Sequence, residues 1–303
     1  MNAERSRAAH RAGLGSGVSL FFLAPWLVTL VLFHLYPLVQ SLWLSFTDRN
    51  LLRAAAPRFV GFENYRSLLA DPDFWSAMKT TGLFVLGTVP VTTALALGLA
   101  LFLARPSRAQ GFARSVVFFP SIVAFSVVAL IFKSLYAPGG PLVSALASLG
   151  VHVPTILNDP ALALPAVMVM DIWMAAGYYA VLLLAGLLSV PGELYDAARL
   201  DGARSWTIFT RITLPAIRPV LLFALVLNTI RSFQVFVEIY VMTRGGPLGS
   251  TMTAVYFLYE EAFFHFEMGR ASAASYLLFV VILVFSAIQI ARFRLGSPLA
   301  EAR

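Results

Sequence analysis

Long apolar runs alternate with shorter polar segments along most of the chain. A helix that crosses the hydrocarbon core of a bilayer needs about 20 predominantly apolar residues. Runs of roughly this length lie at six places, at about 18–39, 81–104, 115–136, 161–189, 216–242 and 271–291. Backbone amides must be satisfied inside a membrane, so each run is expected to be a helix. The pattern therefore predicts an all-α, polytopic membrane protein with six transmembrane helices.

Basic residues in the connecting segments indicate how these helices are oriented. Arginines lie in tail 1–17, after the second run, in the polar segment after the fourth run and in tail 293–303, whereas the loop around Gly140 has none. The positive-inside rule makes the basic segments and both termini cytoplasmic. The long segment after the first run also carries arginines, but long segments weigh little in that rule. A signal peptide is the alternative for the first run, yet no small-residue cleavage site follows it.

One polar segment, 191–215, separates the fourth and fifth runs. Pro191 suits the first turn of a helix, and Glu193 is favourable at a helix N-terminus. Gly202 lacks a Cβ, so the backbone can turn sharply there or let another surface approach closely. Beyond it, apolar residues recur at helical spacing: Trp206, Phe209 and Ile212. The segment is therefore predicted to be two short helices joined by a turn.

An ordered set of acidic, small and apolar residues in this segment resembles the EAA loop of binding-protein-dependent ABC importer permeases: Asp196, Ala197, Ala198, Asp201, Gly202, Ala203, Phe209, Ile212, Leu214 and Pro215. The resemblance implies a type I importer permease whose transmembrane domain covers 18–292 and whose coupling helix docks on a separate ATPase. The family usually has Glu where this chain has Asp196, a side chain shorter by one methylene. From the residues alone, the alternative is an amphipathic helix lying on the bilayer surface.

Later stretches resemble the fifth helix of sugar-importing permeases: 232–236, 239–243 and Gly245-Gly246-Pro247. This resemblance implies the maltose-type branch, in the bacterial inner membrane and surrounded by its lipid. There a permease pairs with a second, homologous permease (a heterodimer), two ATP-binding subunits and an extracytoplasmic solute-binding protein. We expect a sugar or oligosaccharide as the solute. ATP and Mg belong to the partner subunits, so this chain needs no cofactor. The alternative solute is glycerol-3-phosphate or a glycerophosphodiester.

Polar side chains inside the apolar runs are costly unless they face a cavity, a partner or each other. On the fifth run, Asn228, Arg231 and Ser232 share a helical face that extends to Val235. The predicted substrate pathway comprises Asp171, Tyr178, Tyr179, Asn228, Arg231, Ser232, Gln234, Val235 and Glu238. The alternative is that Asp171, Arg231 and Glu238 form a structural charge cluster. We hypothesise that Arg231 pairs with Asp171 or Glu238.

Composition excludes several other classes of protein. Hydrophobic residues make up 59% of the chain and charged residues 12%, far from the quarter or so that is charged in soluble proteins. The net charge of +7 is dispersed between apolar runs, which argues against nucleic acid as a partner. There is no cysteine, no HExxH and no GxxxxGK[ST], so no catalytic, metal or ATP site is expected. A self-contained secondary transporter is the rival class, but it gives no reason for the motif around Gly202.

Overall fold

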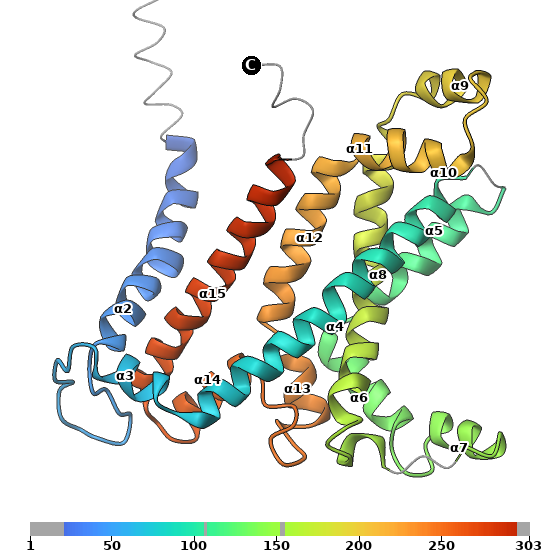
Figure 1. The fold of residues 1–303 in the computed structure, drawn as a ribbon. Helices are drawn as coiled ribbons and strands as arrows, with labels where there is room; N and C mark the ends of the chain where they lie inside the picture. The colour runs from blue at the N-terminus through green and yellow to red at the C-terminus, as the bar shows by residue number, and fades with distance from the viewer. Residues whose placement is uncertain (1–20, 106–107, 152–154, 296–303) are drawn as a thin grey trace, which may run out of the picture. The chain divides into compact units, whose positions relative to one another are not determined.

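The computed structural model describes residues 21–105, 108–151 and 155–295. Every regular element in these ranges is helical, apart from one antiparallel bridge between Thr47 and Phe59. The predicted all-α class is confirmed (Figure 1). The chain divides into two compact units, one of Met1–Leu68 with Glu261–Tyr276 and one of Leu69–Glu260 with Leu277–Arg303.

Five helical stretches are long and apolar enough to cross a membrane in the described residues, and a sharply bent helix pair provides a sixth candidate. The five are Phe21–Ser45, Pro72–Leu103, Ala163–Leu188, Arg218–Met242 and Met268–Phe293. The first contains the π-helix η1 (Val31–Leu35) and α2 (Tyr36–Ser45); the second is α4, the third α8, and the last lies within α15 (Met268–Leu295). The shorter helices are α3 (Glu63–Leu69), α7 (Pro141–Ser148), η3 (Ile156–Asn158) and α14 (Ala254–Phe263).

The helix that contains the second predicted run, 81–104, begins earlier than the run itself. Helix α4 begins at Pro72 because the Asp71 side chain accepts a hydrogen bond from the Asp73 backbone N–H at 2.8 Å and caps the first turn. The mixed residues after Pro72 therefore belong to the helix. The first run also continues beyond the predicted 39, to Ser45, and its residues 18–20 lie outside the described part.

The third predicted run, 115–136, is not one straight helix. It consists of α5 (Gln110–Phe118), the 3₁₀-helix η2 (Phe119–Ile122) and α6 (Phe125–Leu135), with a bend of 92° at the break. Pro120 has no N–H to donate to the preceding turn, and its ring obstructs a continuous α-helix. Val123 and Ala124 are extended, with ψ of 142° and 136°, and this turns the chain into α6.

The fifth run, predicted as a continuous helix over 216–242, is broken as well. Helix α12 (Arg218–Phe233) ends before α13 (Val237–Met242), and Phe236 has φ −144° and ψ −56° between them. Lys133, from the last turn of α6, donates its Nζ to the carbonyl oxygen of Val241 at 2.9 Å. Helix α13 is thus bonded to α6, while α12 packs on α4 and α8.

Small residues hold the second unit's long helices close together. Buried alanines line the contacts among α4, α8 and α12: Ala96, Ala100, Ala175, Ala180 and Ala224. A Cβ at Gly177 of α8 would collide with the carbonyl oxygen of Val117, and one at Gly186 would lie 3.1 Å from Val220 Cβ. Membrane helices pack closely through such residues because lipid provides no hydrophobic drive for association.

Within the second unit, the predicted coupling segment and the segment after α4 lie at the same end (Figure 1). Helices α9 (Gly192–Leu200) and α10 (Ser205–Ile208) lie near the start of α5 at this end, whereas α7 and α13 lie at the other. The π-helix η4 (Phe209–Thr213) and α11 (Leu214–Ala216) lead from α10 into α12.

Candidate functional site

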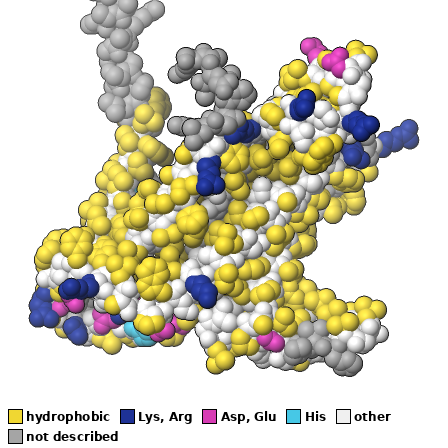
Figure 2. All heavy atoms as spheres, in the orientation of Figure 1, with side chains coloured by type: hydrophobic (Ala, Val, Ile, Leu, Met, Phe, Trp, Pro, Cys, Tyr) yellow, Lys and Arg dark blue, Asp and Glu magenta, His cyan; other side chains and the backbone are white. Residues whose placement is uncertain are grey.

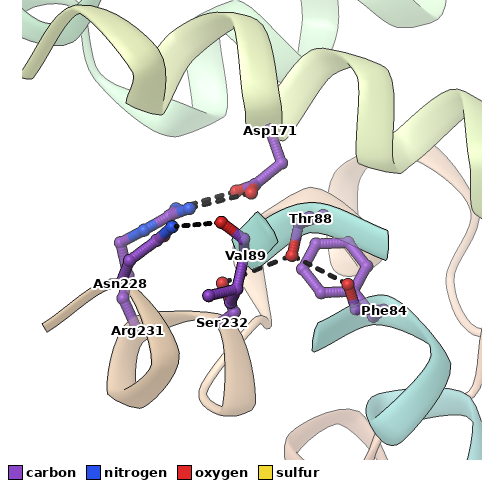
Figure 3. A network of polar contacts seen from close by, with 7 residues as sticks. All are labelled: Phe84, Thr88, Val89, Asp171, Asn228, Arg231 and Ser232. Carbon is purple, nitrogen blue, oxygen red and sulfur yellow. Dashed lines mark hydrogen bonds and ion pairs between the residues drawn. The ribbon is translucent and has the colours of Figure 1, made fainter. Parts of the chain in front are cut away.

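A largely buried ion pair joins α8 to the last turn of α12. Arg231 donates Nη1 to Asp171 Oδ1 at 2.7 Å and Nη2 to Oδ2 at 2.8 Å (Figure 3). The side chain of Asp171 is 1% exposed and that of Arg231 is 28% exposed. Two parallel charge-assisted hydrogen bonds hold the guanidinium plane in one orientation. The hypothesised pairing of Arg231 is confirmed, with Asp171 as its partner.

A cavity of about 340 Å³ opens beside this pair. Its lining comes from four elements: Met174, Ala175, Tyr178 and Tyr179 of α8, Leu227 and Arg231 of α12, Ser121 of η2 and Phe125 of α6. The Phe125 ring centroid lies 5.7 Å from the Arg231 guanidinium carbon. An apolar, aromatic wall with a few oriented polar groups is typical of small-molecule sites.

Tyr178, Tyr179 and Arg231, all predicted for the pathway, line this cavity. The two tyrosine rings meet edge to face, with centroids 5.1 Å apart. Tyr178 is 47% exposed and Tyr179 only 3%. Tyr178 is therefore the more accessible ring in the cavity wall, and it packs against the buried Tyr179.

Asn228 and Ser232 are not part of the cavity lining. Both are buried against α4, where Asn228 donates Nδ2 to the carbonyl oxygen of Val89 at 3.4 Å. Thr88 donates its hydroxyl to Ser232 Oγ at 3.4 Å (Figure 3). Within the described residues, the Asn228 side-chain oxygen has no hydrogen-bond partner. These residues tie α12 to α4 in this structure.

The prediction of one helical face from Asn228 to Val235 is wrong past Phe233. The spacing rule assumes an unbroken helix, and α12 ends at Phe233. Val235 is 4% exposed and belongs to the apolar core, while Gln234 is exposed. Glu238 is buried on α13 at 5% exposure.

The coupling segment turns at Gly202 through a Schellman motif. The Gly202 N–H donates to the Arg199 carbonyl at 3.1 Å, and the Ala203 N–H donates to the Ala198 carbonyl at 2.9 Å. Gly202 has φ +73°, the left-handed conformation that this motif requires after the helix end. No atom lies within 4 Å of a Cβ placed there. The backbone angle alone therefore accounts for the glycine within this chain.

Most of the coupling segment is exposed. Asp196 pairs with Arg199 at 3.0 Å, with both side chains more than two-thirds exposed. Trp206 is 73% exposed, and its ring centroid lies 5.5 Å from that of Phe209. Of the other predicted positions, Ala197, Asp201 and Pro215 are exposed, Ala203, Ile212 and Leu214 are half-buried, and Ala198 is buried. The segment thus presents an open surface with a fixed turn.

Residues 93–293 match the family described as binding-protein-dependent transport system inner membrane component. The chain belongs to this family. The permease is 33% identical to the lactose transport system permease protein LacF of Rhizobium radiobacter over 88% of its own length and 91% of that protein. It is 34% identical to the trehalose/maltose transport system permease protein MalF of Thermococcus litoralis, over 89% and 92%.

The fold of the permease is also that of a solved ABC importer. It matches a chain of a bacterial ABC transporter involved in the import of the acidic polysaccharide alginate with a TM-score of 0.82. Identity is 22%, over 95% of the permease and 98% of that chain. The predicted type I importer fold is confirmed, and the permease is a membrane-embedded transport subunit.

Ser121 and Phe125 of the permease line the cavity but were missed by sequence reasoning. They reach it because the chain bends between η2 and α6. Pro120 was the available signal, because a proline inside an apolar run favours a break.

Proposed function

We propose that the permease passes a neutral sugar or oligosaccharide through the cavity between α8, α12 and α6. Relatives that match most of its length are named for lactose and for trehalose/maltose transport. The chemistry of the lining supports this solute class. A sugar can place an apolar face on the Tyr178 ring while its hydroxyls bond to nearby hydroxyl and guanidinium groups.

The ion pair is the observation that carries the choice of a neutral solute. The charge of Arg231 is compensated by Asp171 through two short hydrogen bonds. A phosphate entering the cavity would have to displace that carboxylate, leaving a buried anion without its partner. This cost argues against the alternative solutes, glycerol-3-phosphate and glycerophosphodiesters.

Coupling to ATP hydrolysis belongs to the same proposal. ATP-binding subunits, which bring ATP and Mg, would dock on segment 191–215. The exposed surface around Asp196 and Gly202 supports this role. Two such subunits, a second homologous permease and an extracytoplasmic solute-binding protein complete the importer. Both termini of this chain are then cytoplasmic. Movement of the ATP-binding subunits would pass through α9 to α12 and open the cavity alternately to each side.

The test compares two aromatic residues of α8 with nearly equal exposure. Tyr178 lines the cavity and is 47% exposed, whereas Trp173 is 49% exposed and does not line it. In cells with the whole importer, Tyr178→Ala should raise the concentration for half-maximal sugar uptake about tenfold, the effect of losing about 1.4 kcal/mol of binding. Trp173→Ala should leave it near the wild-type value. Equal effects in the two variants would contradict the cavity assignment.

Competition and nucleotide dependence separate the alternatives. Labelled sugar uptake should be inhibited by unlabelled neutral sugars and not by glycerol-3-phosphate. In proteoliposomes, uptake should require the ATP-binding subunits and internal ATP. Uptake by the purified chain alone, without nucleotide, would instead identify a secondary transporter.

A further inference from the structure

The loop that follows α2 is fixed at its neck by several bonds. The Asp48 N–H donates to the Arg58 carbonyl at 3.0 Å, and the Arg58 N–H donates to Asp48 Oδ1 at 2.7 Å. The Arg58 guanidinium donates to Asp48 Oδ2 from Nε at 2.9 Å and from Nη2 at 2.8 Å. These bonds, the backbone N–H first, lower the pKa of Asp48, so its carboxylate stays charged. These bonds hold the two ends of the loop together in a defined conformation.

This loop encloses a second cavity, of about 260 Å³, rich in positive charge. Arg49, Arg53 and Arg58 line it together with one acid, Asp48. Arg58 is paired with that acid, whereas the side chains of Arg49 and Arg53 form no hydrogen bond or ion pair with any other described residue. The cavity therefore carries uncompensated positive charge, and arginine donors match the oxygens of a phosphate.

The loop also lies at the end of a membrane-crossing helix. The candidate span Phe21–Ser45 ends three residues before Asp48. Trp43 and Phe59 stack with ring centroids 5.7 Å apart, and they are 57% and 65% exposed. Exposed aromatic rings are typical of the boundary between lipid and water. Figure 2 shows basic side chains gathered beside this end of α2, next to hydrophobic ones.

We propose that the loop Asp48–Arg58 binds the phosphate of an anionic phospholipid, with Arg49 and Arg53 as its main donors. The acyl chains would lie along the exposed apolar side chains of the preceding helix, among them Leu38, Val39 and Leu42. The proposal explains arginines that the positive-inside rule does not. It is independent of the transported solute and of the coupling segment.

The test measures lipid retained by the purified full-length chain. The chain is reconstituted with phosphatidylcholine and phosphatidylglycerol, and retained lipids are counted by native mass spectrometry. Arg49→Gln with Arg53→Gln removes two charges and leaves the Asp48–Arg58 pair intact. This double variant should bind phosphatidylglycerol about tenfold more weakly, since each basic residue at an anionic surface contributes on the order of a fewfold in affinity. Its melting temperature should stay at the wild-type value.

The matched control removes two charges elsewhere. Arg66 and Lys79 are exposed and do not line the cavity. Arg66→Gln with Lys79→Gln should retain phosphatidylglycerol as the wild type does. Added inorganic phosphate separates the sources of the ligand: displacement of the lipid would assign the site to free phosphate, and no displacement to the lipid headgroup. Equal retention by the two double variants would overturn the proposal. The proposal would also be overturned if Arg49→Gln with Arg53→Gln left lipid binding unchanged but weakened the binding of an acidic solute-binding protein.

Discussion

The guanidinium of Arg231 donates two hydrogen bonds, of 2.7 and 2.8 Å, to the carboxylate of Asp171, although the two residues are 60 positions apart in the chain. The pair joins α8 to α12, and Arg231 forms part of the wall of the larger cavity. The same contact therefore links two long helices of the second unit and, in the proposed pathway, limits the charge that a solute would encounter.

Removal of one member of this pair should be more damaging than removal of both. Asp171→Ala should destabilise the permease by about 2–3 kcal/mol, below the cost for a fully buried pair, because the partly buried Arg231 charge loses its partner. Asp171→Leu combined with Arg231→Met replaces the pair with apolar side chains and should recover most of that loss. The melting temperature of the purified importer measures both effects. Strictly additive losses would show that the two residues act independently.

Substitutions at Gly202 should separate the turn from the docking surface. Gly202→Asn keeps access to the left-handed conformation and should preserve the turn, whereas Gly202→Val should cost about 1–2 kcal/mol in local backbone energy. If close approach of a partner also requires glycine, both variants should lose the ATP-binding subunits on co-purification while still inserting in the membrane. Normal ATP-dependent uptake by Gly202→Trp would refute the docking role.

A substitution at Asp196 should reduce the coupling of ATP hydrolysis to uptake while leaving the stability of the permease almost unchanged. Its pair with Arg199 is exposed, so Asp196→Ala should change stability by less than about 1 kcal/mol. Coupling should nevertheless fall, as seen in uptake per ATP hydrolysed by the reconstituted importer. Asp196→Glu keeps the charge and should retain coupling. An Asp196→Ala importer with wild-type coupling would remove this residue from the docking surface.

Gly177 and Gly98 form a contrasting pair inside two membrane helices. Gly177→Ala places a methyl group against the Val117 carbonyl and should destabilise by about 1–3 kcal/mol, the usual cost of overpacking. Gly98→Ala meets no atom within 4 Å, so it should be neutral or gain up to about 1 kcal/mol from helix propensity. Thermal melting in detergent compares the two. Equal melting temperatures would contradict the close contact between α5 and α8.

The sequence was sufficient for the helical class and for the polar segment at 191–215, because both depend on local composition. The turn at Gly202 followed from the one residue type that readily adopts a positive φ. The pairing of Arg231 could be anticipated because a buried charge needs a partner. The identity of the acid could not be anticipated, because Asp171 and Glu238 are distinguished as partners only by where the fold places them.

Breaks within apolar runs were harder to foresee. Pro120 is a sequence signal for the bend before α6, whereas the break after Phe233 contains neither proline nor glycine. Helical spacing consequently placed Asn228 and Val235 on one face. The start of α4 was missed for a simpler reason, because the cap at Asp71 lies among residues too polar to read as part of a span.

The break between Phe233 and Val237 divides the fifth membrane crossing into a long helix, α12, and a separate short helix, α13. A tilt delivered at the Arg218 end would be carried rigidly as far as Phe233, where α12 ends. The short helix α13 is bonded instead to α6, through Lys133. Residues 234–236 thus separate the part of this crossing that continues from the coupling segment from the part that is bonded to α6.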